Sequence, residues 1–274
     1  MSPSSTFSSH IVFQRELMPR SEIKETETME ETIAPGQEEQ PPGRSVARLK
    51  AVLFDWDGTI VDSAQAMFLS YRHAYEKHLG IVFPVDDADF RTLVPMRLAE
   101  SSARFGGEKA SDVAFSYNQY YEQEGYRAGR VYEGVREVLV ELRRRGYPLG
   151  VASNKSSGRV GADVDYLGLG GLVDEFVTSE DTVQRKPHPA PLLKLAEKLQ
   201  VEPQYCAYIG DYRGDIIAAR EAGMVSIAVM WGGMFPTETL LAEHPDYVVE
   251  RPEELLDLFP GPRLPEGTIE RGPL

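Results

Sequence analysis

Short apolar runs that stop abruptly at polar residues constrain the fold of this chain more than any other feature. Ala51-Val-Leu-Phe54 is the first such run, and it ends at Asp55. Similar runs occupy residues 149–152, 175–178, 207–209 and 226–230, and a weaker one occupies 247–249. Continuous apolar runs of this length are typical of strands that are buried on both faces of a parallel sheet.

Helical patterns fill the segments between these runs. Apolar residues three and four positions apart place one apolar face on a helix that starts at Val135 and ends near Gly146, and residues 192–199 repeat the pattern. Strands that alternate with helices imply right-handed crossovers. The predicted fold is therefore α/β, with a Rossmann-like doubly wound parallel sheet.

The alternation is interrupted between residues 64 and 130, where helical spacing continues without a convincing strand. We predict a helical cap at 64–130, inserted into a catalytic core formed by 49–63 and 131–250. The aromatic residues of this segment, Tyr121 among them, are interpreted as core packing. Arg97 is a conceivable substrate contact, but the preferred interpretation places it on a charged solvent face. Residues 1–48 are rich in Ser, Thr, Glu and Pro and are predicted to be a disordered tail, while 251–274 form a C-terminal segment.

Composition excludes several kinds of partner. The formal net charge is −14 and no basic stripe offsets it, which argues against a nucleic-acid partner. No stretch approaches the roughly 20 apolar residues that span a bilayer, so no membrane partner is expected. Cys206 is the single cysteine and is interpreted as a buried thiol, so the expected compartment is the reducing cytoplasm. Both a monomer and a homodimer are compatible with the sequence.

Polar side chains follow the predicted strands at the points where the strands end. The first run ends in Asp55-Trp-Asp57, the second in Ser153-Asn154, and the fourth in Gly210-Asp211. In an open parallel sheet these ends lie at one edge, where ligands gather. Asp215 follows Asp211 by four residues, so a helix that starts there places both carboxylates on one side.

Several carboxylates in one cleft repel each other unless a cation lies among them. Oxygen ligands without His or Cys favour Mg²⁺. Such an ion would hold Asp55 ionised as a nucleophile towards phosphorus, while Asp57 serves as general acid and then general base. Ser153 and the amides after it can bind phosphate oxygens, and Lys186 is the candidate cation that offsets the charge of the transferred phosphoryl group.

The four polar segments resemble the motifs of the haloacid dehalogenase superfamily, in the right order. Phe54-Asp-Trp-Asp-Gly-Thr-Ile-Val-Asp-Ser63 resembles the first motif and Ala152-Ser-Asn154 the second. Lys186-Pro187 resembles the third, and Gly210-Asp-Tyr-Arg-Gly-Asp215 the fourth. The helical insertion is similar to the small cap of the phosphoglycolate phosphatase-like branch, in which the cap sets substrate choice.

The resemblance implies a role for each motif residue. Asp55 would be the nucleophile and Asp57 the acid and base. Asp55, the main-chain carbonyl of Asp57, and Asp211 would hold Mg²⁺, with Asp215 orienting a metal-bound water. Ser153 and Asn154 would bind the substrate phosphate, and Lys186 would steady both this phosphate and the nucleophile.

The expected function is hydrolysis of a small phosphorylated metabolite through an aspartyl-phosphate intermediate. Dehalogenases and phosphonoacetaldehyde hydrolases lack the second aspartate of the first motif, so Asp57 argues against both. A beta-phosphoglucomutase-like phosphosugar mutase is one alternative, although such mutases usually carry Glu-Asp where this chain has Gly210-Asp211. The other alternative is a non-catalytic binding protein on the same fold.

Overall fold

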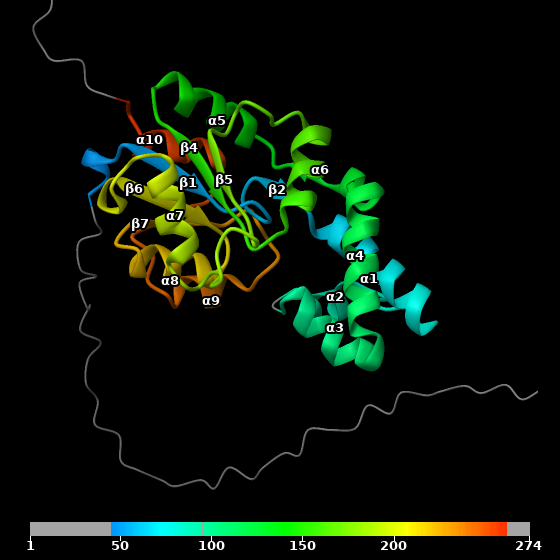
Figure 1. Cartoon of the computed structure of the whole chain (residues 1–274). Coiled ribbons are helices and arrows are strands. Elements are labelled where there is room, and N and C mark those ends of the chain that lie inside the picture. The colour runs from blue at the N-terminus through cyan, green and yellow to red at the C-terminus, as the bar shows by residue number, and fades with distance from the viewer. Residues whose placement is uncertain (1–44, 95, 262–274) are drawn as a thin grey trace, which may run out of the picture. The chain divides into compact units, whose positions relative to one another are not determined.

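A six-stranded parallel sheet forms the centre of the structure, a computed structural model that describes residues 45–94 and 96–261. The strand order is β5-β4-β1-β6-β7-β8 (Figure 1). The strands are β1 (Ala51–Phe54), β4 (Leu149–Ala152), β5 (Glu175–Val177), β6 (Cys206–Gly210), β7 (Val225–Val229) and β8 (Tyr247–Val249). The predicted doubly wound α/β sheet is confirmed. The predicted tail lies outside the described residues except for 45–48, which contain the 3₁₀ helix η1 (Val46–Arg48).

The register of the central strands brings the motif residues to one edge. Phe54 at the end of β1 pairs with Val151 of β4 and with Ile209 of β6. The main-chain nitrogen of Asp55 then donates to the Ile209 carbonyl oxygen at 2.8 Å. Asp55, Ser153 and Asp211 therefore follow their strands at nearly the same level.

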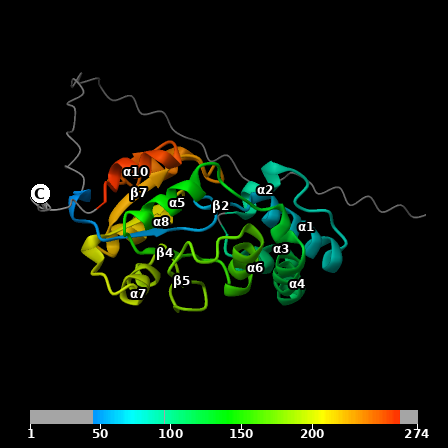
Figure 2. The same cartoon turned by 90° about the horizontal axis from the view of Figure 1, so that it is seen from above.

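Helices cover both faces of the sheet, which explains why the strands read as continuous apolar runs. Side chains alternate along β1, so Val52 and Phe54 share one apolar cluster with α5 (Val135–Arg144) and α10 (Leu255–Leu258). Ala51 and Leu53 share the other cluster with α7 (Ala190–Lys198) and α8 (Arg213–Glu221). Figure 2 shows α10 and α7 on opposite sides of the strands.

Four helices between β2 and β3, here called the helical insert, form a cluster of their own. They are α1 (Ala64–Leu79), α2 (Asp87–Leu93), α3 (Leu98–Gly106) and α4 (Ala110–Gln123). The aromatic rings predicted as core packing, Tyr71, Tyr75 and Tyr117 among them, are buried in this cluster. Helix α1 ends at Gly80, which has the left-handed φ of 67° that favours glycine.

Two short strands, β2 (Val61–Asp62) and β3 (Arg130–Val131), carry the chain into and out of the insert as an antiparallel pair. The sequence did not predict them, because two residues are too few to show a period. The remaining helices are α6 (Ser157–Leu167) and α9 (Thr237–Leu241), with 3₁₀ turns η2 (Gly107–Lys109), η3 (Gly125–Ala128), η4 (Pro203–Tyr205) and η5 (Pro252–Glu254). Among the described residues, no helix is both long and apolar enough to cross a membrane.

Candidate active site

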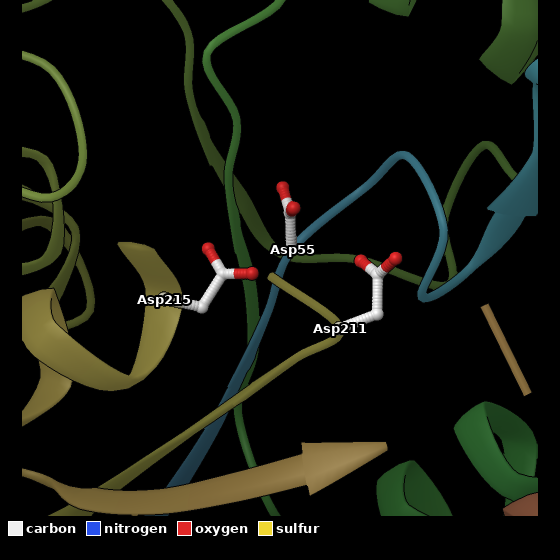
Figure 3. Close-up of side chains that lie close together, drawn as sticks. All are labelled: Asp55, Asp211 and Asp215. Carbon is white, nitrogen blue, oxygen red and sulfur yellow. The ribbon is translucent and has the colours of Figure 1, made fainter. Parts of the chain in front are cut away.

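Three carboxylates from separate segments meet at the carboxyl edge of the sheet. Asp55 directly follows β1, Asp211 follows β6, and Asp215 lies in the first turn of α8. All three are buried, and one oxygen of each lies within 4.8 Å of the others. Their carboxyl groups lie close together (Figure 3). The structure thus brings together three of the predicted metal ligands, although they lie up to 160 residues apart in the sequence.

Local contacts fix Asp211 and Asp215 but leave one oxygen of Asp211 without a donor among the described residues. The Thr59 hydroxyl donates to Asp211 Oδ1 at 3.3 Å, and the main-chain nitrogen of Tyr212 donates to Asp215 Oδ2 at 3.0 Å. Asp211 Oδ2 is buried and accepts no hydrogen bond from the described residues, whereas Asp215 Oδ1 lies 2.8 Å from Lys186 Nζ. Buried polar atoms without partners are uncommon, and a binding site for an ion is one reason for them.

The negative charges of the three carboxylates repel one another. We call Asp55, Asp211 and Asp215 the acidic trio. Burial raises the pKa of Asp55 to about 7, and the nearby Asp215 adds to the rise against the opposing pull of Lys186. Burial likewise raises the pKa of Asp211 well above its usual value, with Asp55 and Asp215 adding to the effect. A divalent cation relieves this repulsion, and an all-oxygen donor set suits Mg²⁺. The residues present therefore fit the predicted ion.

Lys186 provides a buried positive charge beside the trio. Its Nζ lies 2.7 Å from Asp55 Oδ1 and 2.8 Å from Asp215 Oδ1, and the side chain is 2% exposed. Burial lowers the pKa of Lys186, but Asp215 and Asp55 outweigh this effect and hold the pKa well above its usual value. Nζ also donates to the Tyr208 hydroxyl at 2.7 Å, which in turn donates to the Ala152 carbonyl oxygen. Lys186 is therefore a fixed cation at the predicted nucleophile.

Asn154 braces the loop that carries Lys186. Its Nδ2 donates to the Lys186 carbonyl oxygen at 3.2 Å, and its Oδ1 accepts from the Lys186 main-chain nitrogen at 3.1 Å. Both ends of the amide are thus engaged with main chain. Ser153 is buried beside it, and its Oγ accepts from the Lys155 main-chain nitrogen at 3.1 Å. No described residue accepts the hydroxyl proton of Ser153, which is therefore available to a ligand.

Asp57 lies apart from the trio and has different partners. Its Oδ1 accepts from the Ser63 hydroxyl at 2.5 Å and from Lys155 Nζ at 2.8 Å. Burial acts to raise the pKa of Asp57, but Lys155 outweighs it and the net shift is downwards. Asp55 and Asp57 therefore lie in different environments, with their pKa values shifted in opposite directions.

A cavity of about 290 Å³ opens onto these groups. From the core it is lined by Asp55, Asp57, Ser153, Asn154 and Lys186, the predicted catalytic and phosphate-binding residues. The helical insert contributes Met67, Tyr71, Tyr117 and Arg97 to the same lining. Arg97, for which a solvent face was preferred over a substrate contact, is exposed and also borders the cavity.

The sequence patterns indicated no role for Lys155 or Asp163. For Tyr121 they predicted the packing of the ring but not the contact made by the hydroxyl. Lys155 is buried between Asp57 and Asp163, and the Tyr121 hydroxyl donates to Asp163 at 3.0 Å. The prediction of core packing is confirmed for the Tyr121 ring, which is buried. The Tyr121 hydroxyl, however, contacts the charged groups of Lys155 and Asp163. One signal was present: Asp163 falls on the stripe of α6 that otherwise carries Val160, Val164 and Leu167.

The loop after β7, to which the sequence assigned no role, supports the trio. A Cβ atom at Gly232 would lie 2.5 Å from Asp211 Oδ2 and 2.5 Å from the Gly58 carbonyl oxygen. The Tyr132 hydroxyl donates to the Gly232 carbonyl oxygen at 2.9 Å, and Trp231 Nε1 donates to the Thr59 carbonyl oxygen at 3.0 Å. The absence of a side chain at position 232 thus allows this loop to pack against Asp211.

Comparison with known proteins agrees with the geometry. Residues 52–229 match the family model described as haloacid dehalogenase-like hydrolase. The chain is 34% identical over 216 residues to the PpaX protein of Caldanaerobacter subterraneus subsp. tengcongensis, covering 78% of this chain and 96% of that protein. It is 29% identical over 211 residues to the pyrophosphatase PpaX of Bacillus velezensis, covering 77% and 96%. A solved haloacid dehalogenase-like family hydrolase from Streptococcus pneumoniae superposes with a TM-score of 0.69 at 26% identity, covering 77% of this chain and 99% of that one. The chain belongs to the haloacid dehalogenase-like hydrolases, a family of enzymes.

Proposed function

We propose that the protein is a Mg²⁺-dependent phosphatase that hydrolyses a small phosphorylated metabolite through an aspartyl-phosphate on Asp55. One observation carries the proposal: Asp55 lines the cavity while sharing close contacts with the other carboxylates of the trio and with Lys186. A carboxylate that faces a cavity with a cation beside it is suited to attack an anionic phosphate. The name of the Bacillus velezensis relative points to the same reaction class.

In the proposed reaction, a carboxylate oxygen of Asp55 forms a bond to phosphorus as the bond to the leaving oxygen breaks. Asp57 gives its proton to that oxygen, and the alcohol or acid departs. Asp57 then takes a proton from water, whose oxygen attacks phosphorus and releases phosphate from Asp55. Lys186 and Ser153 contact the phosphoryl oxygens throughout.

The metal site of this proposal consists of Asp55, Asp211 and the main-chain carbonyl of Asp57, with Asp215 orienting a water. When bound, Mg²⁺ neutralises charge on the phosphoryl oxygens and on the acidic trio. The donor-free, buried Oδ2 of Asp211 supports this assignment. We assign the helical insert, within residues 64–130, as a cap that excludes water from the cavity, since its residues line one side.

The cavity favours a leaving group that carries its own negative charge. Arg97, Arg159 and Arg185 all line it, and in the described part of the chain none of them pairs with a carboxylate. Glu100 is the one acidic lining residue besides Asp55 and Asp57. The Arg159 guanidinium lies over the Tyr117 ring at 5.4 Å from its centroid.

The Tyr117 hydroxyl adds a donor to this arginine-rich side. Tyr117 is 1% exposed and lines the cavity, and its hydroxyl has no hydrogen-bond partner among the described residues. We therefore place compounds with a second anionic group first among the substrates. Pyrophosphate is one of them, as the name of the Bacillus velezensis relative also suggests.

A panel of phosphate esters that includes pyrophosphate and phosphoglycolate tests the proposal. With Mg²⁺ present, wild-type protein should release inorganic phosphate, and Asp55→Asn should lower kcat by at least about a thousandfold because it removes the nucleophile. Asp165→Asn, an exposed carboxylate on α6, is the matched control and should retain activity. Wild-type turnover by Asp55→Asn contradicts the proposal. Interconversion of bisphosphate-primed sugar phosphates with little release of phosphate would establish the mutase alternative instead.

A further inference from the structure

Lys155 is a buried cation held between two carboxylates. Its side chain is 1% exposed, and Nζ lies 2.8 Å from Asp57 Oδ1 and 2.6 Å from Asp163 Oδ2. Nζ also donates to the Tyr121 hydroxyl and lies 4.2 Å from the centroid of that ring. A buried ammonium group is tolerated only when its charge and its hydrogens find partners. Here the two carboxylates and the tyrosine provide them.

Asp163 completes this arrangement from outside the cavity. Its side chain is 0% exposed, and it does not line the cavity. Trp56 Nε1 donates to its Oδ2 at 2.9 Å, and the Tyr121 hydroxyl donates to its Oδ1 at 3.0 Å. Both oxygens are thus occupied, and Lys155 has one defined position. Replacing a buried ion pair by apolar side chains of similar size is often neutral or even stabilising. Stability alone therefore does not explain why a carboxylate is buried at position 163.

The consequence appears at Asp57, whose two oxygens are not equivalent. Oδ1 accepts from both Lys155 Nζ and the Ser63 hydroxyl. Oδ2 accepts no hydrogen bond from the described residues, although Asp57 lines the cavity. The carboxyl group therefore has one anchored oxygen and one oxygen that is available for proton exchange.

The groups that anchor Asp57 come from three separate parts of the chain. Lys155 follows β4, Asp163 lies on α6, and Tyr121 lies on α4 of the helical insert. We propose that Asp163 and Tyr121 are positioning residues: they hold Lys155 against Oδ1 of Asp57 and so direct Oδ2 to the leaving group. This inference rests on the proposed function, in which Asp57 is the acid and base. It extends that function to two residues that do not line the cavity.

The dependence of the rate on the leaving group distinguishes a positioning role for Asp163 and Tyr121 from a merely structural one. An alkyl phosphate needs a proton on its leaving oxygen, whereas p-nitrophenyl phosphate releases a weakly basic phenolate without one. The ratio of kcat/KM for the two substrates therefore reports the acid step of phosphoryl transfer to Asp55. The alkyl phosphate used is the best one that wild-type protein hydrolyses in the panel.

Asp163→Asn removes one negative charge with little change of shape. We expect kcat/KM for the alkyl phosphate to fall by about 10- to 100-fold, within the range of general acid catalysis, and that for p-nitrophenyl phosphate to fall less than about threefold. Tyr121→Phe removes only a hydroxyl and should give a smaller split in the same direction. Asp165→Asn, on the same helix but exposed, should leave the ratio unchanged. Circular dichroism and thermal unfolding check that each variant is folded. If Asp163→Asn does not fold, the result for Tyr121→Phe decides whether the positioning role is correct.

Asp57→Asn separates this inference from the proposed function. In this variant kcat/KM should fall much more for the alkyl phosphate than for p-nitrophenyl phosphate, because the acid itself is lost. If it does while Asp163→Asn and Tyr121→Phe lower both substrates equally, or neither, the positioning role is wrong and the proposed function stands. If Asp57→Asn shows no split, the acid role of Asp57 fails, and the inference fails with it.

Discussion

Gly58 and Asp211 lie in such close contact that a Cβ atom at position 58 would be 2.1 Å from Asp211 Oδ2. Gly58 also has a φ of 82°, which L side chains rarely adopt. Position 58 therefore accepts only glycine while Asp211 keeps its place in the acidic trio. This contact links the first and fourth motifs directly.

Gly58→Ala should displace Asp211 and weaken Mg²⁺ binding. We expect the Mg²⁺ concentration for half-maximal activity to rise at least about tenfold. The substitution should also lower the stability of the fold through a backbone strain of about 1–2 kcal/mol. Gly80→Ala is the control, because Gly80 has a φ of 67° and nothing within 4 Å of a Cβ atom. It has comparable strain without the clash, so an equal change in metal dependence in both variants would contradict the explanation.

Mg²⁺ should stabilise the fold more at high pH than at low pH. Burial raises the pKa of Asp55 from 3.8 to about 7, so the metal-free folded chain holds a proton there that the unfolded chain has lost. The metal-free protein therefore loses stability through this group as pH rises from about 4 to about 7. Because Mg²⁺ competes with that proton, the difference in Tm between Mg²⁺ and EDTA should grow from about pH 5.5 to about pH 8. A constant difference would show that Asp55 does not bind in competition with protons, and Asp55→Asn should flatten the dependence.

Lys186→Met should destabilise the protein strongly in EDTA. The substitution leaves Asp55 and Asp215 buried without their cation, and breaking a buried pair in this way costs about 3–5 kcal/mol. Urea unfolding in EDTA measures the loss. Lys198→Met is the matched control, because Lys198 pairs with Glu175 at 2.8 Å while 36% exposed. Such surface pairs contribute about 1 kcal/mol or less, so comparable losses in the two variants would argue against a paired buried Lys186.

Cys206 should resist thiol reagents in the native protein. It is fully buried, and burial raises the pKa of its thiol to about 12. Because the thiolate is the reactive form, native labelling should be slow and should rise about tenfold per pH unit through pH 9 without levelling off. In urea the rate should level off above about pH 8.5, the usual thiol pKa. Fast labelling of folded protein at neutral pH would contradict the burial of Cys206.

Sequence patterns predicted what depends on neighbours along the chain. The buried strands are readable because both faces are covered, and the motif aspartates are readable because they follow strand ends such as Phe54. The pairing of Lys155 with Asp163 depends instead on how α6 packs beside the catalytic loop, which no local pattern encodes. Helix α2 was not distinguished within the helical segment for another reason: its seven residues make only about two turns, too few to show a clear apolar period.

The contact of Tyr121 with Asp163 has a consequence for protein engineering. A fragment transplanted from another hydrolase in place of α1–α4 would bring new substrate contacts, but it would also remove the phenol that reaches the core. Chimeras that restore a tyrosine at that point should outperform otherwise identical ones that carry phenylalanine. Under the proposed positioning role, substrate recognition and proton transfer could not be exchanged independently of each other.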